Sequence, residues 1–248
     1  AFRKALELHL HRGLWCRMHY HYIGDGLSSS EANFRAALDI AKQHQDQVWI
    51  AGMADIHKYQ TERNASKLAL IRVLFAGRQD VYASRWESAN SGRAGWSPVV
   101  KGGWQQSKSK HREYLPLSDD VLAAHLRGEV AVGIYPLAHG DTCRLLACDF
   151  DGKTWALDAL AFIDACRDLD VPAALERSRS GDGAHVWVFF SEPVPAATAR
   201  SIGAGLLRRA MARRVEIDLI SYDRLSPSQD FMPKGPFGNL IAPPLQGG

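Results

Sequence analysis

Two aspartates, Asp149 and Asp151, stand one residue apart at the end of the apolar run Leu145–Cys148. Side chains of a β-strand alternate between its two faces, so both carboxylates are expected to point the same way, with Phe150 opposite. Like charges held this close repel each other unless a cation lies between them. Carboxylate oxygens are the ligands that divalent cations such as Mg²⁺ prefer. The pair therefore predicts metal-dependent phosphate chemistry.

A glycine-bearing turn between two predicted strands offers groups that bind phosphate. The strands are Ala173–Arg177 and His185–Phe190. Glycines in the turn let backbone N–H groups approach a phosphate closely. A plain hairpin needs only the Gly-Asp-Gly residues, so the donors around them favour contact with a polyanion. These donors are Arg177, Arg179, Ser180 and His185.

The first motif also has a second interpretation. Asp149-Phe150-Asp151-Gly152-Lys153 is similar to the motif that opens haloacid-dehalogenase-type phosphatases, in which the first aspartate is a nucleophile. Here more than one hundred residues precede the motif, and Lys153 stands where a threonine is expected. A phosphohydrolase of this type, or a nucleic-acid-binding module without catalysis, remains the alternative.

The composition is that of a globular protein with a mild excess of positive charge. The 248 residues are 46% hydrophobic and carry a net charge of +3, which permits a nucleic-acid partner without requiring one. No apolar run reaches the roughly 18 residues that a membrane span needs, so no membrane partner is expected. The cysteines form no CxxC pair, which indicates a reduced, cytoplasmic compartment. They are Cys16, Cys143, Cys148 and Cys166.

The elements that must position these residues follow from hydrophobic periodicity. Helices are predicted over 119–127, 155–169 and 196–213, and further strands over 130–135, 144–149 and 215–220. This pattern predicts an α/β fold with a mixed or antiparallel sheet and helices packed on one face. The polar stretch 78–118 carries a basic run near Trp96 and Trp104. Base stacking and an ordinary solvated loop both explain it.

The two motifs together resemble motifs I and II of the archaeo-eukaryotic primase superfamily, which combines a DxD or DxE pair with an SxH-type element. Further segments, within about residues 70–248, are similar to the primase domain of TOTE conflict-system proteins. They are Arg78–Trp86, Gly133–Leu137, Ser221–Leu225, Pro227–Asp230 and Gly238–Ile241. The resemblance implies an RRM-like catalytic core. It also implies a primase-polymerase that transfers nucleotides from NTPs or dNTPs to a 3′-hydroxyl on a DNA or RNA template.

By position, the resemblance implies two sets of functional residues. The first set would hold two Mg²⁺ or Mn²⁺ ions: Asp149, Asp151 and Asp223, with Asp218 as the alternative third ligand. The second set would bind the nucleotide triphosphate: Ser180, His185, Arg177, Arg179 and Arg224. Family members often carry a cysteine cluster before Leu115, which this sequence lacks, so no structural zinc is expected.

The chain is expected to have two parts. Residues 71–248 would be the catalytic domain, truncated at its C-terminus and followed in the parent protein by a helicase region. Residues 1–70 are of uncertain origin and are faintly similar to the C-terminal end of a polysaccharide deacetylase, in which His21 would match a late histidine. The catalytic aspartate and the metal-binding HxxxH pair of that family are missing, so no deacetylase activity is expected.

Overall fold

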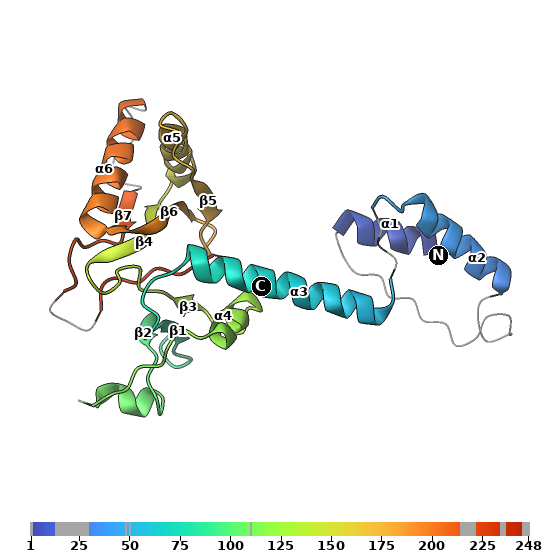
Figure 1. Ribbon diagram of the computed structural model, residues 1–248, viewed down its shortest axis with the longest axis horizontal. Helices are drawn as coiled ribbons and strands as arrows, with labels where there is room; N and C mark the ends of the chain where they lie inside the picture. The colour runs from blue at the N-terminus through green and yellow to red at the C-terminus, as the bar shows by residue number, and fades with distance from the viewer. Residues whose placement is uncertain are drawn as a thin grey trace. The chain divides into compact units, whose positions relative to one another are not determined.

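The computed structural model describes residues 2–12, 30–47, 49, 51–109, 111–213, 222–233 and 237–244. It divides into two compact units, Ala1–Arg63 and Asn64–Gly248 (Figure 1). Three predictions fall outside the described residues: the strand over 215–220, the alternative ligand Asp218, and His21 of the deacetylase-like segment.

In the described residues of the first unit, the regular secondary structure is helical. It contains α1 (Phe2–Arg12) and α2 (Glu31–Gln43), and α3 (Met53–Leu74) begins in it and ends in the second unit. Ser30 caps α2, since its Oγ accepts a hydrogen bond from the Asn33 backbone N–H at 3.2 Å. The start of α2 is therefore encoded locally, by the residue that precedes it.

The second unit contains two antiparallel sheets (Figure 1). The smaller sheet has the order β2-β1-β3, formed by β1 (Ala83–Glu87), β2 (Ala94–Pro98) and β3 (Val132–Gly133). The larger has the order β5-β6-β4-β7, formed by β4 (Thr142–Asp151), β5 (Ala174–Arg177), β6 (Gly183–Pro195) and β7 (Tyr222–Ser226). Besides the end of α3, the helices in the described part of this unit are α4 (Asp119–Leu126), α5 (Trp155–Arg167), α6 (Ala196–Arg213) and the 3₁₀ helix η1 (Trp104–Lys108). The predicted α/β class is confirmed.

The division into two sheets differs from the sequence interpretation, which left the stretch 78–118 without strands. The β1–β2 hairpin lies in that stretch. Its strands are polar and contain a glycine, so they lack the alternation that marks a strand. At Gly95, a Cβ atom would lie 2.9 Å from the Trp86 ring. The bare glycine therefore lets the indole cover the neighbouring strand.

The two faces of the larger sheet bury different sets of side chains. Leu146, Cys148 and Phe150 of β4 face α5 and α6, which lie on the same side of the sheet in Figure 1. Leu145 and Ala147 face the other way, in a second core that the end of α3 completes. Because side chains alternate along a strand, Asp149 lies on the same face of β4 as Leu145 and Ala147, past the end of this core. The carboxylates are thus carried by a strand that is buried on both faces.

None of the helices within the described ranges has the length and apolar character that a membrane span requires.

The buried cysteines give a test of this core. Burial raises the pKa of Cys143 and of Cys166 to about 11, and raises that of Cys148 well above its usual value. Because the thiolate is the reactive form, these thiols should resist modification. In a Cys16→Ser variant at about pH 8, we expect Ellman's reagent to label none of the three buried thiols in native protein. All should react in guanidinium, and rapid labelling before unfolding would contradict the packing.

Candidate active site

Three carboxylates meet at the end of β4. Asp149, Asp151 and Asp223 each offer an oxygen, and these oxygens all lie within 4.8 Å of one another. Asp149 and Asp151 share a face because of strand alternation. Asp223 reaches them through a β-bulge: β7 pairs Arg224 with Asp149 but Tyr222 with Phe150, leaving Asp223 as the extra residue. A bulge re-aims a side chain in this way.

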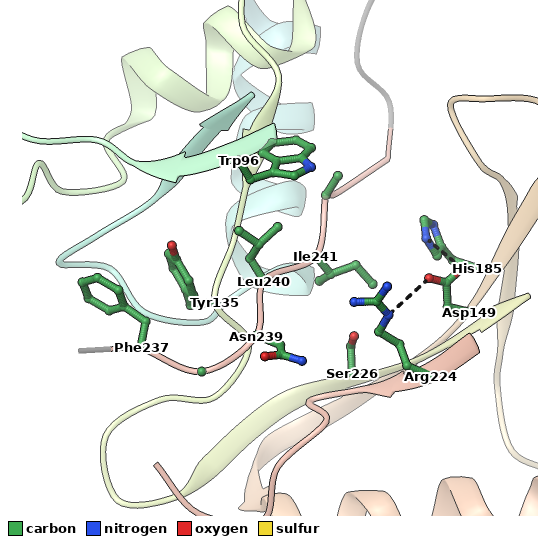
Figure 2. Close-up of a pocket in the computed structure, with 12 residues that line it drawn as sticks. Trp96, Tyr135, Asp149, His185, Arg224, Ser226, Phe237, Asn239, Leu240 and Ile241 are labelled. Atoms are coloured by element: carbon green, nitrogen blue, oxygen red, sulfur yellow. Dashed lines mark ion pairs between the residues drawn. The ribbon is translucent and has the colours of Figure 1, made fainter. Parts of the chain in front are cut away.

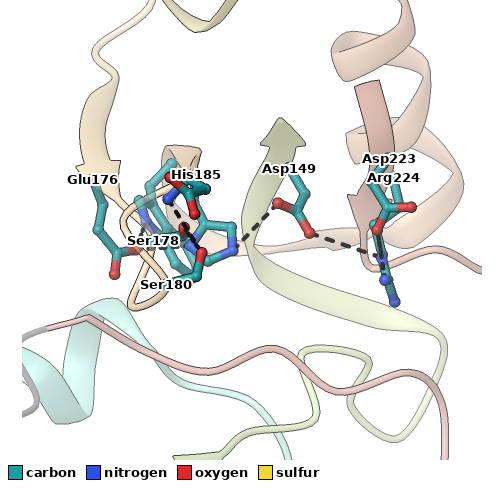
Figure 3. A network of polar contacts seen from close by, with 9 residues as sticks. Asp149, Glu176, Ser178, Ser180, His185, Asp223 and Arg224 are labelled. Carbon is teal, nitrogen blue, oxygen red and sulfur yellow. Dashed lines mark hydrogen bonds and ion pairs between the residues drawn. The ribbon is translucent and has the colours of Figure 1, made fainter. Parts of the chain in front are cut away.

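The cluster concentrates negative charge near the surface, where Asp149 is partly buried and Asp151 and Asp223 are exposed. Burial raises the pKa of Asp149, and the charges of Asp151 and Asp223 raise it further, against the opposing effects of His185 and Arg224. The Arg224 Nε donates to Asp223 Oδ2 at 2.6 Å and lies 3.9 Å from Asp149 Oδ2 (Figure 3). A set of carboxylate oxygens is the ligand set that Mg²⁺ and Mn²⁺ prefer. The residues present therefore fit a divalent cation.

His185 lies directly opposite Asp149 in the β4–β6 pairing. Its Nε2 is 3.5 Å from Asp149 Oδ1, and its Nδ1 is 3.0 Å from Glu176 Oε2 (Figure 3). Burial works to lower the pKa of His185, but the hydrogen bond to Glu176 and the charges of Glu176, Asp149 and Asp151 outweigh it and raise the pKa. The site thus favours a positively charged imidazole next to the carboxylates.

The turn before β6 is held by its own hydrogen bonds. Gly181 adopts a φ of +84°, the left-handed region that glycine enters without strain. The Arg177 Nε donates to the Gly181 carbonyl at 2.8 Å. The Ser180 Oγ lies 3.0 Å from Ser178 Oγ and accepts from the Asp182 N–H at 3.3 Å. Ser180 is therefore fixed within an exposed turn.

Two cavities meet at His185. The larger, of about 610 Å³, has Asp149, His185 and Arg224 on one side. Its other side is formed by aromatic and aliphatic side chains: Trp96, Tyr135, Phe237, Leu240 and Ile241 (Figure 2). The smaller cavity, of about 310 Å³, is bordered by three cations: Arg85, Arg177 and Arg179. Small-molecule sites commonly have volumes of this order.

The structure brings most of the predicted site residues together. The three aspartates converge, and His185 and Arg224 adjoin them. Arg177 and Arg179 border the smaller cavity, whereas Ser180, on its turn, borders neither cavity.

The site also contains residues other than the predicted metal and nucleotide ligands. Trp96, for which base stacking is one of the two explanations offered by the sequence, lines both cavities. Glu176, Arg85 and the segment from Phe237 to Ala242 were missed. For Glu176 a signal existed, since a carboxylate stands in a short predicted strand that faces a histidine across a hairpin. For Arg85 and the C-terminal segment, no local pattern pointed to the site.

One comparison with known proteins, a match to a family model, agrees with the sequence motifs. Residues 66–248 match the family model described as the TOTE conflict system, archaeo-eukaryotic primase domain. No curated protein matches the chain. A solved structure with some similarity is the polymerase domain from Mycobacterium tuberculosis ligase D in complex with DNA. The identity is 18%, the TM-score is 0.36, and the similarity covers 60% of this chain and 61% of that one. Because the family match spans well over half of the sequence, the chain belongs to the archaeo-eukaryotic primase domain family of TOTE conflict systems.

Proposed function

We propose that this chain is a metal-dependent nucleotidyltransferase that adds nucleotides from NTPs or dNTPs to a 3′-hydroxyl on a DNA or RNA template. The observation that carries this proposal is the convergence of three aspartate oxygens within 4.8 Å, next to a histidine. Membership of the primase domain family supports it. Residues 71–248 would form the catalytic domain, with a helicase region in the same parent protein.

In this proposal, Asp149, Asp151 and Asp223 hold two divalent cations, Mg²⁺ or Mn²⁺. Such ions supply activation of the attacking hydroxyl and neutralisation of the leaving pyrophosphate. The protein contributes position: β4 fixes two ligands on one face, and the bulge in β7 supplies the third. Arg224 offsets part of the negative charge without entering the ligand set.

The nucleotide would lie where the two cavities meet. His185 borders both, so it can contact a triphosphate that extends from the carboxylates toward Arg177 and Arg179. Arg85 adds a third cation to that cavity, and Ser180 would donate from the turn. The aromatic wall of the larger cavity offers apolar surface for a base and sugar. Phosphoryl transfer depends mainly on such positioning and charge.

The test is extension of a labelled primer on a template with Mg²⁺ or Mn²⁺, using NTPs and dNTPs in parallel. Extension that disappears with EDTA is expected. Release of inorganic phosphate without primer growth would instead identify a phosphohydrolase. Nucleic-acid binding without metal dependence or nucleotide incorporation would identify a non-catalytic module.

Metal binding should also appear as stability. Because the three carboxylates are brought together only in the folded state, a cation that binds them stabilises that state by about 2.7 kcal/mol at 100 times its Kd. For a chain of this size that corresponds to a rise in Tm of about 5–10 °C. Differential scanning calorimetry with and without Mn²⁺ measures it. An equal shift in an Asp223→Asn variant would contradict the assignment of the ligands.

A further inference from the structure

Glu176 forms a three-residue chain of contacts that leads from the protein core to the carboxylate cluster. Its Oε2 lies 3.0 Å from His185 Nδ1 and accepts a hydrogen bond from Trp187 Nε1 at 2.8 Å. The β5–β6 pairing places Glu176 directly opposite His185. Strand alternation puts Trp187 on the same face as His185. All three side chains therefore face the side of the sheet that carries Asp149.

Trp187 is a rigid anchor for this chain of contacts. It is 1% exposed. Its ring meets Phe75 edge-on at 5.0 Å and stacks parallel to Phe189 at 6.3 Å. A buried indole N–H needs an acceptor, and Glu176 supplies it. The position of the Glu176 oxygen is therefore fixed by the core.

The fixed oxygen determines how the His185 ring lies. An ionised carboxylate only accepts hydrogen bonds, so the Nδ1 atom must carry a proton and donate it. Nε2 is then the ring atom that faces Asp149, 3.5 Å from Oδ1. Without the acceptor, the ring could turn by half a rotation and present a carbon where Nε2 now lies.

We propose that Glu176 is the positioning residue of this site: it holds the imidazole of His185 with Nε2 directed toward the carboxylates and the nucleotide triphosphate. The inference rests on the proposed function for the identity of the ligand. Although Glu176 borders the smaller cavity, both hydrogen bonds converge on one of its oxygens. Through that oxygen, Glu176 acts on His185.

Because both hydrogen bonds end on one oxygen of Glu176, two variants separate the loss of the acceptor from the loss of the charge. In Glu176→Gln, the amide oxygen can accept both hydrogen bonds, so the orientation of the ring survives. In Glu176→Ala, both are lost. For Glu176→Ala we expect kcat/KM for the nucleotide to fall about 10–100-fold, the usual loss when a supporting hydrogen bond of this kind is removed. The KM for primer–template should not change, and Glu176→Gln should restore most of the activity.

A measurement that does not depend on catalysis tests whether Glu176 orients the His185 ring. Long-range proton–nitrogen NMR of metal-free, nitrogen-15-labelled protein, recorded at a pH at which the imidazole is neutral, reports which ring nitrogen of His185 carries the proton. The wild type and Glu176→Gln should show a protonated Nδ1 in a single environment, and Glu176→Ala should lose that signature. Because this arm needs no turnover, it tests the role of Glu176 even if primer extension fails and refutes the proposed function.

Two controls make the outcome clear. Glu192→Ala removes an exposed carboxylate from β6 of the same sheet and should leave both readouts unchanged. Trp187→Phe deletes one of the two hydrogen-bond donors to Glu176 but keeps the hydrogen bond with His185. It should therefore lower kcat/KM for the nucleotide less than Glu176→Ala does. Should Glu176→Ala fail to fold, Glu176→Gln still tests the proposal through its NMR signature and its activity. An unchanged His185 signature in Glu176→Ala would overturn the proposal, as would a Glu176→Gln variant that keeps the signature but loses the activity.

Discussion

Replacing Asp149 by asparagine is expected to lower nucleotide incorporation by about 10³-fold or more, because several kcal/mol of charge stabilisation depend on the metal ligands. The amide has nearly the same shape as the carboxylate but cannot supply its charge. Primer extension at saturating Mn²⁺ measures the loss. Asp151→Asn should behave in the same way, since both residues belong to one cluster.

Although Asp149→Asn should lower nucleotide incorporation, it should not lower the stability of the metal-free protein. The pKa of Asp149 is raised in the folded state, mainly by burial. A carboxyl group whose pKa is higher in the folded than in the unfolded state destabilises the folded state at pH values above its unfolded pKa. At those pH values the group must ionise while it is partly buried. Removing that charge should therefore leave the metal-free Tm at neutral pH equal to or above that of the wild type.

Asp164→Asn is the matched control. Asp164 forms an exposed ion pair with Arg167 at 2.9 Å on α5, and such pairs contribute little. The variant should keep wild-type extension and a wild-type Tm. If the Asp149/Asp151 double variant retained extension in metal-replete buffer, the carboxylate cluster would not be the catalytic site.

Part of this site could be predicted because it depends on local geometry. The convergence of Asp149 and Asp151 follows from strand alternation alone, and β4 is apolar enough to identify as a strand. His185 lies opposite Asp149 because β4 pairs with β6, and α5 and β5 separate these two strands in the sequence. Local rules therefore account for the shared direction of Asp149 and Asp151, but not for their contact with His185.

The rest depends on pairings that no local pattern encodes. Asp223 joins the cluster through a bulge, and the five residues of β7 are too polar to mark a strand, let alone an irregular one. The apolar wall of the larger cavity comes from a segment that is tied to the fold by the bridge between Ile134 and Ile241. Sequence reasoning reached Asp223 only through family resemblance.

Gly183→Ala is expected to lower nucleotide incorporation about 10²-fold, the loss that a misplacement of roughly 1 Å produces. Gly183 pairs with Asp151 at the end of the β4–β6 ladder. A Cβ atom at this position would lie 2.3 Å from Asp151 Oδ1 and 2.8 Å from the Phe150 carbonyl oxygen. The carbonyl belongs to the strand backbone and cannot give way without opening the ladder. Either the Asp151 side chain turns away or the strand ends separate, and both movements disperse the carboxylates.

Gly205→Ala is the control that separates this effect from a general effect of the substitution. Gly205 lies within α6, where a Cβ atom would meet nothing within 4 Å. Alanine there should stabilise the helix by about 0.5–1 kcal/mol and leave extension unchanged. For Gly183→Ala, the rise in Tm caused by Mn²⁺ should shrink together with primer extension, because both depend on the same oxygens. Full activity in Gly183→Ala would mean that Asp151 can leave its present position without cost, and hence that it is not a ligand.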